Sequence, residues 1–190
     1  MTRLQLEHLI RAASTIADDS DIVVIGSQAI LGQYPDAPAE FLVSKEADVF
    51  PRNHPERAEL IDGSIGEGSP FEKVYGYYAH GIGPETAVLP EGWQDRLIVI
   101  SNPNTLSVRG WCLEVHDLAI AKLVAGREKV LDFVEALQRD AMGRASRYKA
   151  LSINANSGFK LKHRAFRSVR SSMNAIVSTC AINFENWPPL

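Results

Sequence analysis

Residues 22–31 read Ile-Val-Val-Ile-Gly-Ser-Gln-Ala-Ile-Leu, and residues 44–50 read Ser-Lys-Glu-Ala-Asp-Val-Phe. Residues 22–25 are apolar and β-branched, which predicts a short buried strand. Gly26 and Ser27 interrupt this run, and residues 28–31 have the pattern of a first helical turn. A strand that turns at Gly-Ser into a helix presents backbone N–H groups to an anion. Gly26 and Ser27 are therefore candidates for binding a phosphate group, although the pair also suits an ordinary tight turn.

Two acidic residues stand out in the second stretch. In a strand, residues i and i+2 share a face and lie about 6.6 Å apart along the chain, so we expect Glu46 and Asp48 to point the same way. Side-by-side carboxylates repel unless a cation lies between them. Oxygen ligands of this kind suit Mg²⁺ (or Mn²⁺), which also binds nucleotide phosphates. The alternative is a solvated strand face, the usual location of acidic residues.

This combination resembles the signature of the polymerase-β-like nucleotidyltransferase superfamily, in which a Gly-Ser turn precedes a strand carrying [Asp/Glu]-x-[Asp/Glu]. Three longer segments resemble, more narrowly, a family of bacterial nucleotidyltransferase-like proteins. That family is distantly similar to the toxins of abortive-infection type IV toxin–antitoxin systems. The resemblance covers roughly residues 1–140, and the segments are Lys45-Glu-Ala-Asp-Val-Phe-Pro51, Gly76-Tyr-Tyr-Ala-His-Gly-Ile-Gly-Pro-Glu-Thr-Ala87 and His116-Asp-Leu-Ala-Ile-Ala-Lys-Leu-Val-Ala-Gly-Arg-Glu-Lys129.

The resemblance implies an enzyme that transfers a nucleoside monophosphate from an NTP to a hydroxyl group, with Glu46 and Asp48 binding the metal. It implies RNA (tRNA in some relatives), a protein or a small molecule as the acceptor, and a cognate antitoxin as a partner. A catalytically degenerate domain that binds nucleotide, RNA or a partner protein is the alternative. The acidic pair is Glu-x-Asp rather than Asp-x-Asp, which favours this alternative.

Further site candidates follow along the chain. Lys122 and Arg127 are cationic donors for a triphosphate, and Lys129 is a third. In toxin-type relatives a lysine and a later aspartate on these helices belong to the site, which suggests Lys122 and Asp132. Val130 occupies the place where the family pattern has an aspartate. Glu114, at the end of a predicted strand, is a candidate third metal carboxylate, and a solvent-exposed helix face is the alternative for residues 122–132.

The pattern predicts an α/β (α+β) fold in which helices pack on a mixed sheet and a helical C-terminal segment follows. Apolar residues at helical spacing predict a helix over 3–17, with later helices over 27–33, from Pro55 and from Asp117, the last with Asp117 as its N-cap. We expect strands over 45–50, 73–80, 96–100 and 109–115.

Composition and charge add the domain organisation. The chain of 190 residues has 45% hydrophobic and 23% charged residues, which is ordinary for a globular protein. Residues 1–138 hold 11 Lys/Arg against 21 Asp/Glu, whereas residues 139–190 hold 9 against 2. We therefore expect a nucleotidyltransferase-like domain over 1–140 and a basic tail over 141–190, for which RNA binding and a solvated face are both open.

The chain lacks a long apolar run and a signal-peptide pattern, so we expect a cytoplasmic protein without membrane contact. Two cysteines suggest no disulfide framework.

Overall fold

The structure is a computed structural model and describes residues 1–125 of the chain. Its elements confirm the predicted α+β class, with a mixed five-stranded sheet and several helices. The strands are β1 (Asp21–Val24), β2 (Glu46–Pro51), β3 (Tyr78–Gly81), β4 (Ile98–Ile100) and β5 (Arg109–Cys112). The α-helices are α1 (Arg3–Ala17), α2 (Ile30–Gln33), α3 (Ala58–Ile65), α4 (Pro70–Tyr75) and α5 (Val115–Ala125). Short 3₁₀ turns are η1 (Ser27–Ala29), η2 (Ala39–Phe41), η3 (Pro55–Arg57), η4 (Pro84–Thr86), η5 (Trp93–Arg96) and η6 (Pro103–Thr105).

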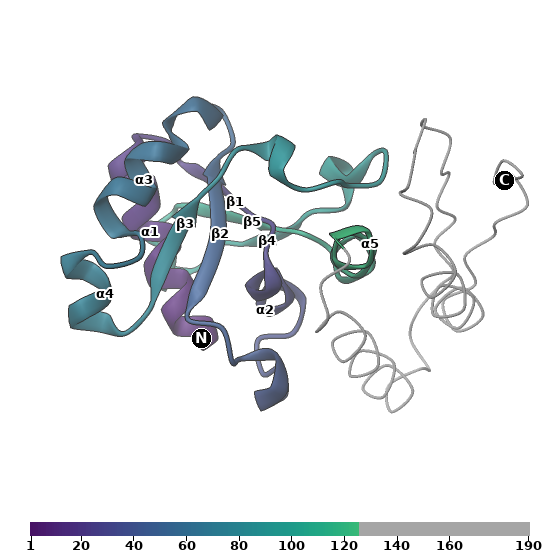
Figure 1. Cartoon of the computed structure of the whole chain (residues 1–190), viewed down its shortest axis with the longest axis horizontal. Helices are drawn as coiled ribbons and strands as arrows, with labels where there is room; N and C mark the ends of the chain where they lie inside the picture. Colours follow the sequence, from purple (N-terminus) through teal and green to yellow (C-terminus); the bar gives the residue numbers. More distant parts are fainter. Residues whose placement is uncertain (126–190) are drawn as a thin grey trace, which may run out of the picture. The chain divides into compact units, whose positions relative to one another are not determined.

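The five strands lie in the order β3-β2-β1-β5-β4. β1 runs antiparallel to β2 and parallel to β5, while β2 and β3 are parallel and β4 is antiparallel to β5. Figure 1 shows β2 and β3 side by side, with α3 in the connection between them. A parallel pair needs such a crossover, because a hairpin reverses the chain direction.

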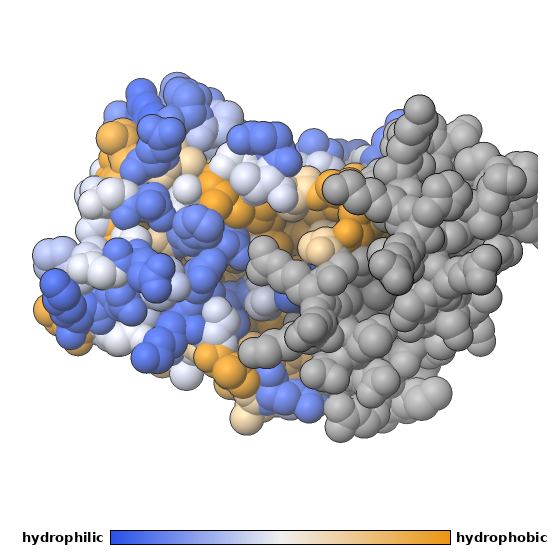
Figure 2. Space-filling model, in the orientation of Figure 1, coloured by the Kyte–Doolittle hydropathy of each residue, from blue (hydrophilic) through white to orange (hydrophobic). Residues whose placement is uncertain are grey.

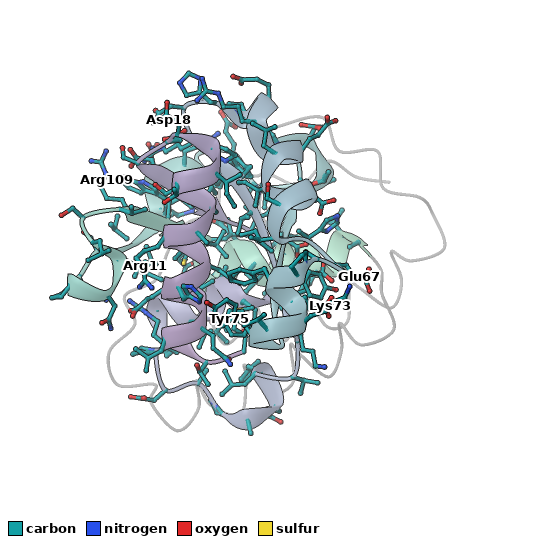
Figure 3. All side chains as sticks on the ribbon, turned by 90° about the vertical axis from the view of Figure 1, so that its left-hand side faces the viewer. Arg11, Asp18, Glu67, Lys73, Tyr75 and Arg109 are labelled. Atoms are coloured by element: carbon teal, nitrogen blue, oxygen red, sulfur yellow. The ribbon has the colours of Figure 1, made fainter. Side chains whose placement is uncertain are left out.

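The register separates the two faces of this sheet. Gly81, Val49, Val24 and Cys112 are paired in one row, so they share a face. Helices cover this face: a Cβ on Gly81 would meet the backbone of α3, and a Cβ on Gly110 would meet Ile10 of α1. Figure 3 shows α1 and α3 side by side in front of the sheet. The other face carries the alternate residues, among them Glu46, Asp48, Tyr78 and His80.

Helix α1 spans the predicted range of 3–17. Thr2 caps its first turn by accepting a hydrogen bond from the backbone of Gln5, whose side chain accepts one from the Thr2 N–H. Asp18 ends the helix in a left-handed conformation. The apolar side of α1 is buried on the sheet through Leu6, Leu9, Ile10, Ala13 and Ala17.

Two expectations for individual elements are wrong. Residues 73–75 belong to helix α4, not to a strand starting at 73, because Ser69 caps the helix and Pro70 begins it. Gly76, with φ 76°, ends it, so β3 starts only at Tyr78. Asp117 is not an N-cap: α5 already begins at Val115, and the Asp117 carboxylate is bound by Arg96.

The chain divides into two compact units, and the sheet lies in the first, Met1–Ala87 with Trp93–Leu118. Val88–Gly92 and Ala119–Ala125 belong to the second. The predicted domain boundary at 140 and the basic tail over 141–190 lie outside the described residues. Within residues 1–125, no helix is long and apolar enough to cross a membrane. Cys112 is fully buried in β5 and packs against Gly32 as a small apolar group.

Candidate metal centre

Strands β2 and β3 bring the two predicted acidic residues together with two residues of the neighbouring strand. Glu46 is paired with Tyr78, and Asp48 with His80, in the parallel ladder. Residues paired in this way point to the same face of a sheet. The surface over β2 and β3 is mainly hydrophilic in the space-filling view (Figure 2). Four polar side chains thus stand on one patch of a sheet whose opposite face is covered by helices.

One imidazole nitrogen lies between the two carboxylates. His80 Nδ1 is 3.2 Å from Glu46 Oε1 and 3.2 Å from Asp48 Oδ1. One ligand atom from each of the three residues lies within 4.8 Å of the other two. The side chains are partly accessible, at 37% for Glu46, 29% for Asp48 and 48% for His80. The cluster is therefore open to a ligand while being held on two paired strands.

Tyr78 orients Glu46 from the adjacent register position. Its hydroxyl donates a hydrogen bond of 3.0 Å to Glu46 Oε2, the oxygen that does not face His80. Burial, with the negative charge of Glu46, raises the pKa of Tyr78 to about 12. The phenol therefore stays protonated and keeps donating across the physiological pH range.

Gly26 lies against the other carboxylate. A Cβ at position 26 would overlap Asp48 Oδ2, so any larger side chain would displace this carboxylate. The backbone N–H of Ile25 donates to the Asp48 carbonyl at 3.0 Å, which places the end of β1 beside β2 here. Gly26 has an extended conformation, φ −79° and ψ −169°, so the close approach and not a left-handed turn accounts for the glycine. The Gly-Ser turn and the acidic pair are thus neighbours in space.

The electrostatics of the pair favour a cation. Burial raises the pKa of Asp48, the adjacent Glu46 raises it further, and His80 partly opposes the rise. Two carboxylate oxygens and an imidazole nitrogen are donor types that bind divalent metals. At metal–ligand distances of about 2.1 Å, neighbouring ligands at right angles lie about 3.0 Å apart. Ligand atoms 3.2 Å apart are compatible with this spacing. The residues present fit a divalent cation.

The described residues do not bring Glu114 into this cluster. Its carboxylate accepts hydrogen bonds from the backbone N–H and Nδ1 of His116, both at 2.8 Å. Burial disfavours the charged form of Glu114, but the His116 bonds outweigh it and lower the pKa of the carboxyl. Glu114 therefore acts as a hydrogen-bond acceptor for the first turn of α5. Among residues 1–125, the third group beside Glu46 and Asp48 is His80.

The remaining site candidates are Ser27, Lys122 and three residues farther along the chain. Ser27 begins η1, directly after Gly26. Lys122 lies on α5 and is half-buried, in the second unit. Arg127, Lys129 and Asp132 lie outside the described residues.

Sequence reasoning missed Tyr78 and His80 as members of the cluster. The sequence indicated a strand here, but its register against β2 depends on where α4 ends. Gly76 was the available signal, since a glycine after a possible helix is a common stop. A strand that begins at Tyr78 and pairs in parallel with β2 places His80 beside Asp48.

Comparison with known proteins gives a family for this chain. Residues 3–138 match the family described as "Nucleotidyltransferase of unknown function (DUF6036)". Searches of curated proteins and of solved structures found no match. The matched range contains the whole sheet, the Gly-Ser turn and the Glu46–Asp48–His80 cluster. The chain therefore belongs to the DUF6036 family of nucleotidyltransferases of unknown function.

Proposed function

We propose that this protein transfers a nucleoside monophosphate from an NTP to a hydroxyl acceptor, using a divalent cation bound by Glu46 and Asp48. The observation that carries the proposal is the convergence of Glu46 Oε1 and Asp48 Oδ1 next to the Gly26 turn. In a nucleotidyltransferase family, an acidic pair beside a glycine turn is a suitable place for a metal and a triphosphate to meet.

The proposed reaction is a displacement at the α-phosphorus. The acceptor oxygen forms a bond to this phosphorus, the bond to the β-phosphate oxygen breaks, and pyrophosphate leaves while the hydroxyl proton passes to solvent. A bound cation supplies positive charge that offsets the charge developing on the phosphate oxygens. Glu46 and Asp48 hold that cation, and Tyr78 keeps Glu46 oriented.

Phosphate binding is assigned to groups near and beyond the pair. Gly26 allows its backbone to approach the site closely, and Ser27 follows as the first residue of the turn. Lys122, with Arg127 and Lys129, is proposed to supply further positive charge to the triphosphate. Asp132 is retained as a candidate metal ligand from the toxin-type resemblance.

Label transfer tests the proposal directly. Full-length protein is incubated with Mg²⁺ or Mn²⁺, each α-³²P-labelled NTP in turn, and either total tRNA or total cell protein. We expect label in one acceptor class with the wild type and none with Asp48→Asn, which keeps the side-chain shape but lacks the charge. Equal labelling by both proteins would contradict the assigned role of Asp48. Absence of label with every NTP and acceptor would contradict the proposed function.

A second candidate function is nucleotide binding without chemistry. It is favoured by Glu114, whose carboxylate is hydrogen-bonded to His116 and does not join the acidic pair as a third metal ligand. A two-metal mechanism generally uses several carboxylates. Saturable binding of an NTP in the presence of metal, without label transfer, would support this candidate. In that case RNA or a partner protein such as an antitoxin is the proposed ligand, and the basic sequence over 141–190 is the part of the chain to test for binding it.

We also propose a cellular role for the protein on the basis of its resemblance to toxins. A role in a toxin–antitoxin or phage-defence system, in the cytoplasm of a bacterium, predicts that expression of the wild type slows growth. Asp48→Asn expressed to the same level should not do so.

A further inference from the structure

We propose that His80 is the third ligand of the metal site, and that the site therefore prefers a transition-series divalent cation such as Mn²⁺ to Mg²⁺. This inference rests on the proposed function, because it names the class of cation at the same site. Its test measures metal binding and not nucleotidyl transfer.

The ligand atoms of Glu46, Asp48 and His80 face one another. Each carboxylate has one oxygen toward His80 and its other oxygen toward a different neighbour. Glu46 uses Oε1 for His80 and Oε2 for the Tyr78 hydroxyl. Asp48 uses Oδ1 for His80 and packs Oδ2 against Gly26. Three atoms, two oxygens and a nitrogen, consequently face a common point.

The paired strands hold the three ligand residues in place. The ligands lie at adjacent positions of paired strands, with His80 directly opposite Asp48 and Glu46 two residues away on the same face. β2 lies inside the sheet, between β3 and β1, and not at its edge. Tyr78 and Gly26 restrict the carboxylates further. Outer contacts of this kind orient metal ligands and raise affinity.

The three donor atoms, two oxygens and one nitrogen, discriminate between metals. Mg²⁺ prefers oxygen ligands and near-ideal octahedral geometry, and it gives up its water reluctantly. Imidazole suits the later divalent metals, whose affinities for nitrogen ligands exceed that of Mg²⁺. With 48% of the His80 side chain exposed, the remaining coordination positions are open to water or phosphate oxygens. A site of two carboxylates and one histidine therefore favours a transition-series cation over Mg²⁺, and Mn²⁺, the weakest binder of that series, gives the most stringent comparison.

In the competing explanation, His80 is only a hydrogen-bond partner of the two carboxylates, with no metal among the three side chains. His54 offers a matched control, because its Nδ1 lies 3.2 Å from Glu56 Oε1 and its side chain is 45% exposed. His54 thus forms the same kind of exposed contact with a carboxylate. It belongs to none of the three-residue metal-ligand groups found among residues 1–125.

The experiment is pulsed electron paramagnetic resonance of Mn²⁺ bound to the tag-free, full-length protein, together with calorimetric titration of Mn²⁺ and Mg²⁺. We expect ¹⁴N coupling from a directly coordinated imidazole in the wild type and in His54→Gln. The coupling should be absent in His80→Asp, which substitutes an oxygen ligand. The ratio of Mg²⁺ to Mn²⁺ dissociation constants should be about tenfold or more in the wild type and should fall several-fold in His80→Asp.

Three outcomes would overturn the inference. They are bound Mn²⁺ without ¹⁴N coupling, coupling that persists in His80→Asp, and no Mn²⁺ binding at millimolar concentration. The two proposals fail in different ways. Coordinated nitrogen without label transfer would contradict the proposed function alone, and label transfer without coordinated nitrogen would contradict this inference alone.

Discussion

Replacing Gly26 by alanine tests whether the Gly-Ser turn positions the acidic pair. The backbone of Gly26, with φ −79° and ψ −169°, is accessible to alanine, so the substitution imposes no backbone strain. The new methyl group would, however, overlap Asp48 Oδ2. Either the carboxylate moves away from His80 or the turn moves away from β2.

The expected magnitude combines two opposing effects. Alanine restricts the unfolded chain relative to glycine, which stabilises a protein by about 0.4–1 kcal/mol when the native backbone permits it. Overpacking costs about 1–3 kcal/mol, because neighbouring groups are forced from their preferred positions. We expect a net loss of about 1 kcal/mol in the free energy of unfolding. Metal affinity should fall by about 10–100-fold, the usual result of disturbing a contact that orients a ligand.

The assay is urea unfolding of the full-length protein in EDTA, followed by calorimetric titration of Mn²⁺. Gly63→Ala is the matched control, since Gly63 lies inside α3 and its Cβ would have no neighbour within 4 Å. That variant should gain about 0.5–1 kcal/mol, because alanine is the better helix former. Its metal affinity should equal that of the wild type.

The two glycine variants should therefore shift stability in opposite directions. If Gly26→Ala stabilises the protein as much as Gly63→Ala and binds Mn²⁺ as tightly as the wild type, the Gly26–Asp48 contact does not hold the carboxylate. The assignment of the turn to the site would then be wrong.

Three further predictions follow from single contacts. Without metal, Asp48→Asn should stabilise the protein at pH 7, because the raised pKa of Asp48 means that its ionisation in the folded state costs stability as the pH rises. The gain should shrink on acidification and vanish below pH 3.8, the ordinary pKa of the carboxyl, as followed by thermal unfolding in EDTA; a gain that is constant with pH would contradict it. Tyr78→Phe removes the hydroxyl that donates a hydrogen bond to Glu46 Oε2. This variant should lower the free energy of unfolding by about 1 kcal/mol and should weaken Mn²⁺ binding. Unchanged Mn²⁺ binding would show that Glu46 needs no orienting group. Arg96→Met leaves the Asp117 carboxylate, 1% exposed, without its two 2.8 Å hydrogen bonds and should cost about 3–5 kcal/mol in urea unfolding. The double variant with Asp117→Leu should recover most of this loss, and failure to do so would show that the pair acts mainly through packing.

The elements best predicted from sequence are those whose pattern is local. The helix over 3–17 has apolar residues at helical spacing and a capping box at Thr2, so its bounds can be read from neighbouring residues alone. The strands at 22–25 and 45–50 agree with β1 and β2 to within one residue at each end. The alternation of Glu46, Ala47 and Asp48 likewise implied that both acidic side chains share a face.

The boundary between α4 and β3 was harder to predict. Lys73, Val74 and Tyr75 are compatible with a strand, and only the cap at Ser69 with the stop at Gly76 makes them helical. An error of a few residues here hides the pairing of His80 with Asp48. Glu114 shows a related difficulty: its partner His116 is only two residues away, but the sequence does not show whether the carboxylate turns to this neighbour or to another strand.

The sequence by itself determined the strand–turn–helix pattern, the acidic pair and the resemblance to a nucleotidyltransferase-like family, since each rests on short segments whose residues are neighbours along the chain. Only the tertiary structure decided which side chain completes the site. His80 is 32 residues from Asp48 along the chain, and their contact depends on the register of two parallel strands joined through α3 and α4. The same holds for Gly26, whose lack of a side chain matters because β1 ends beside Asp48. A strand's own sequence specifies which residues alternate between its faces, whereas the neighbour that it faces is set by how the sheet is assembled.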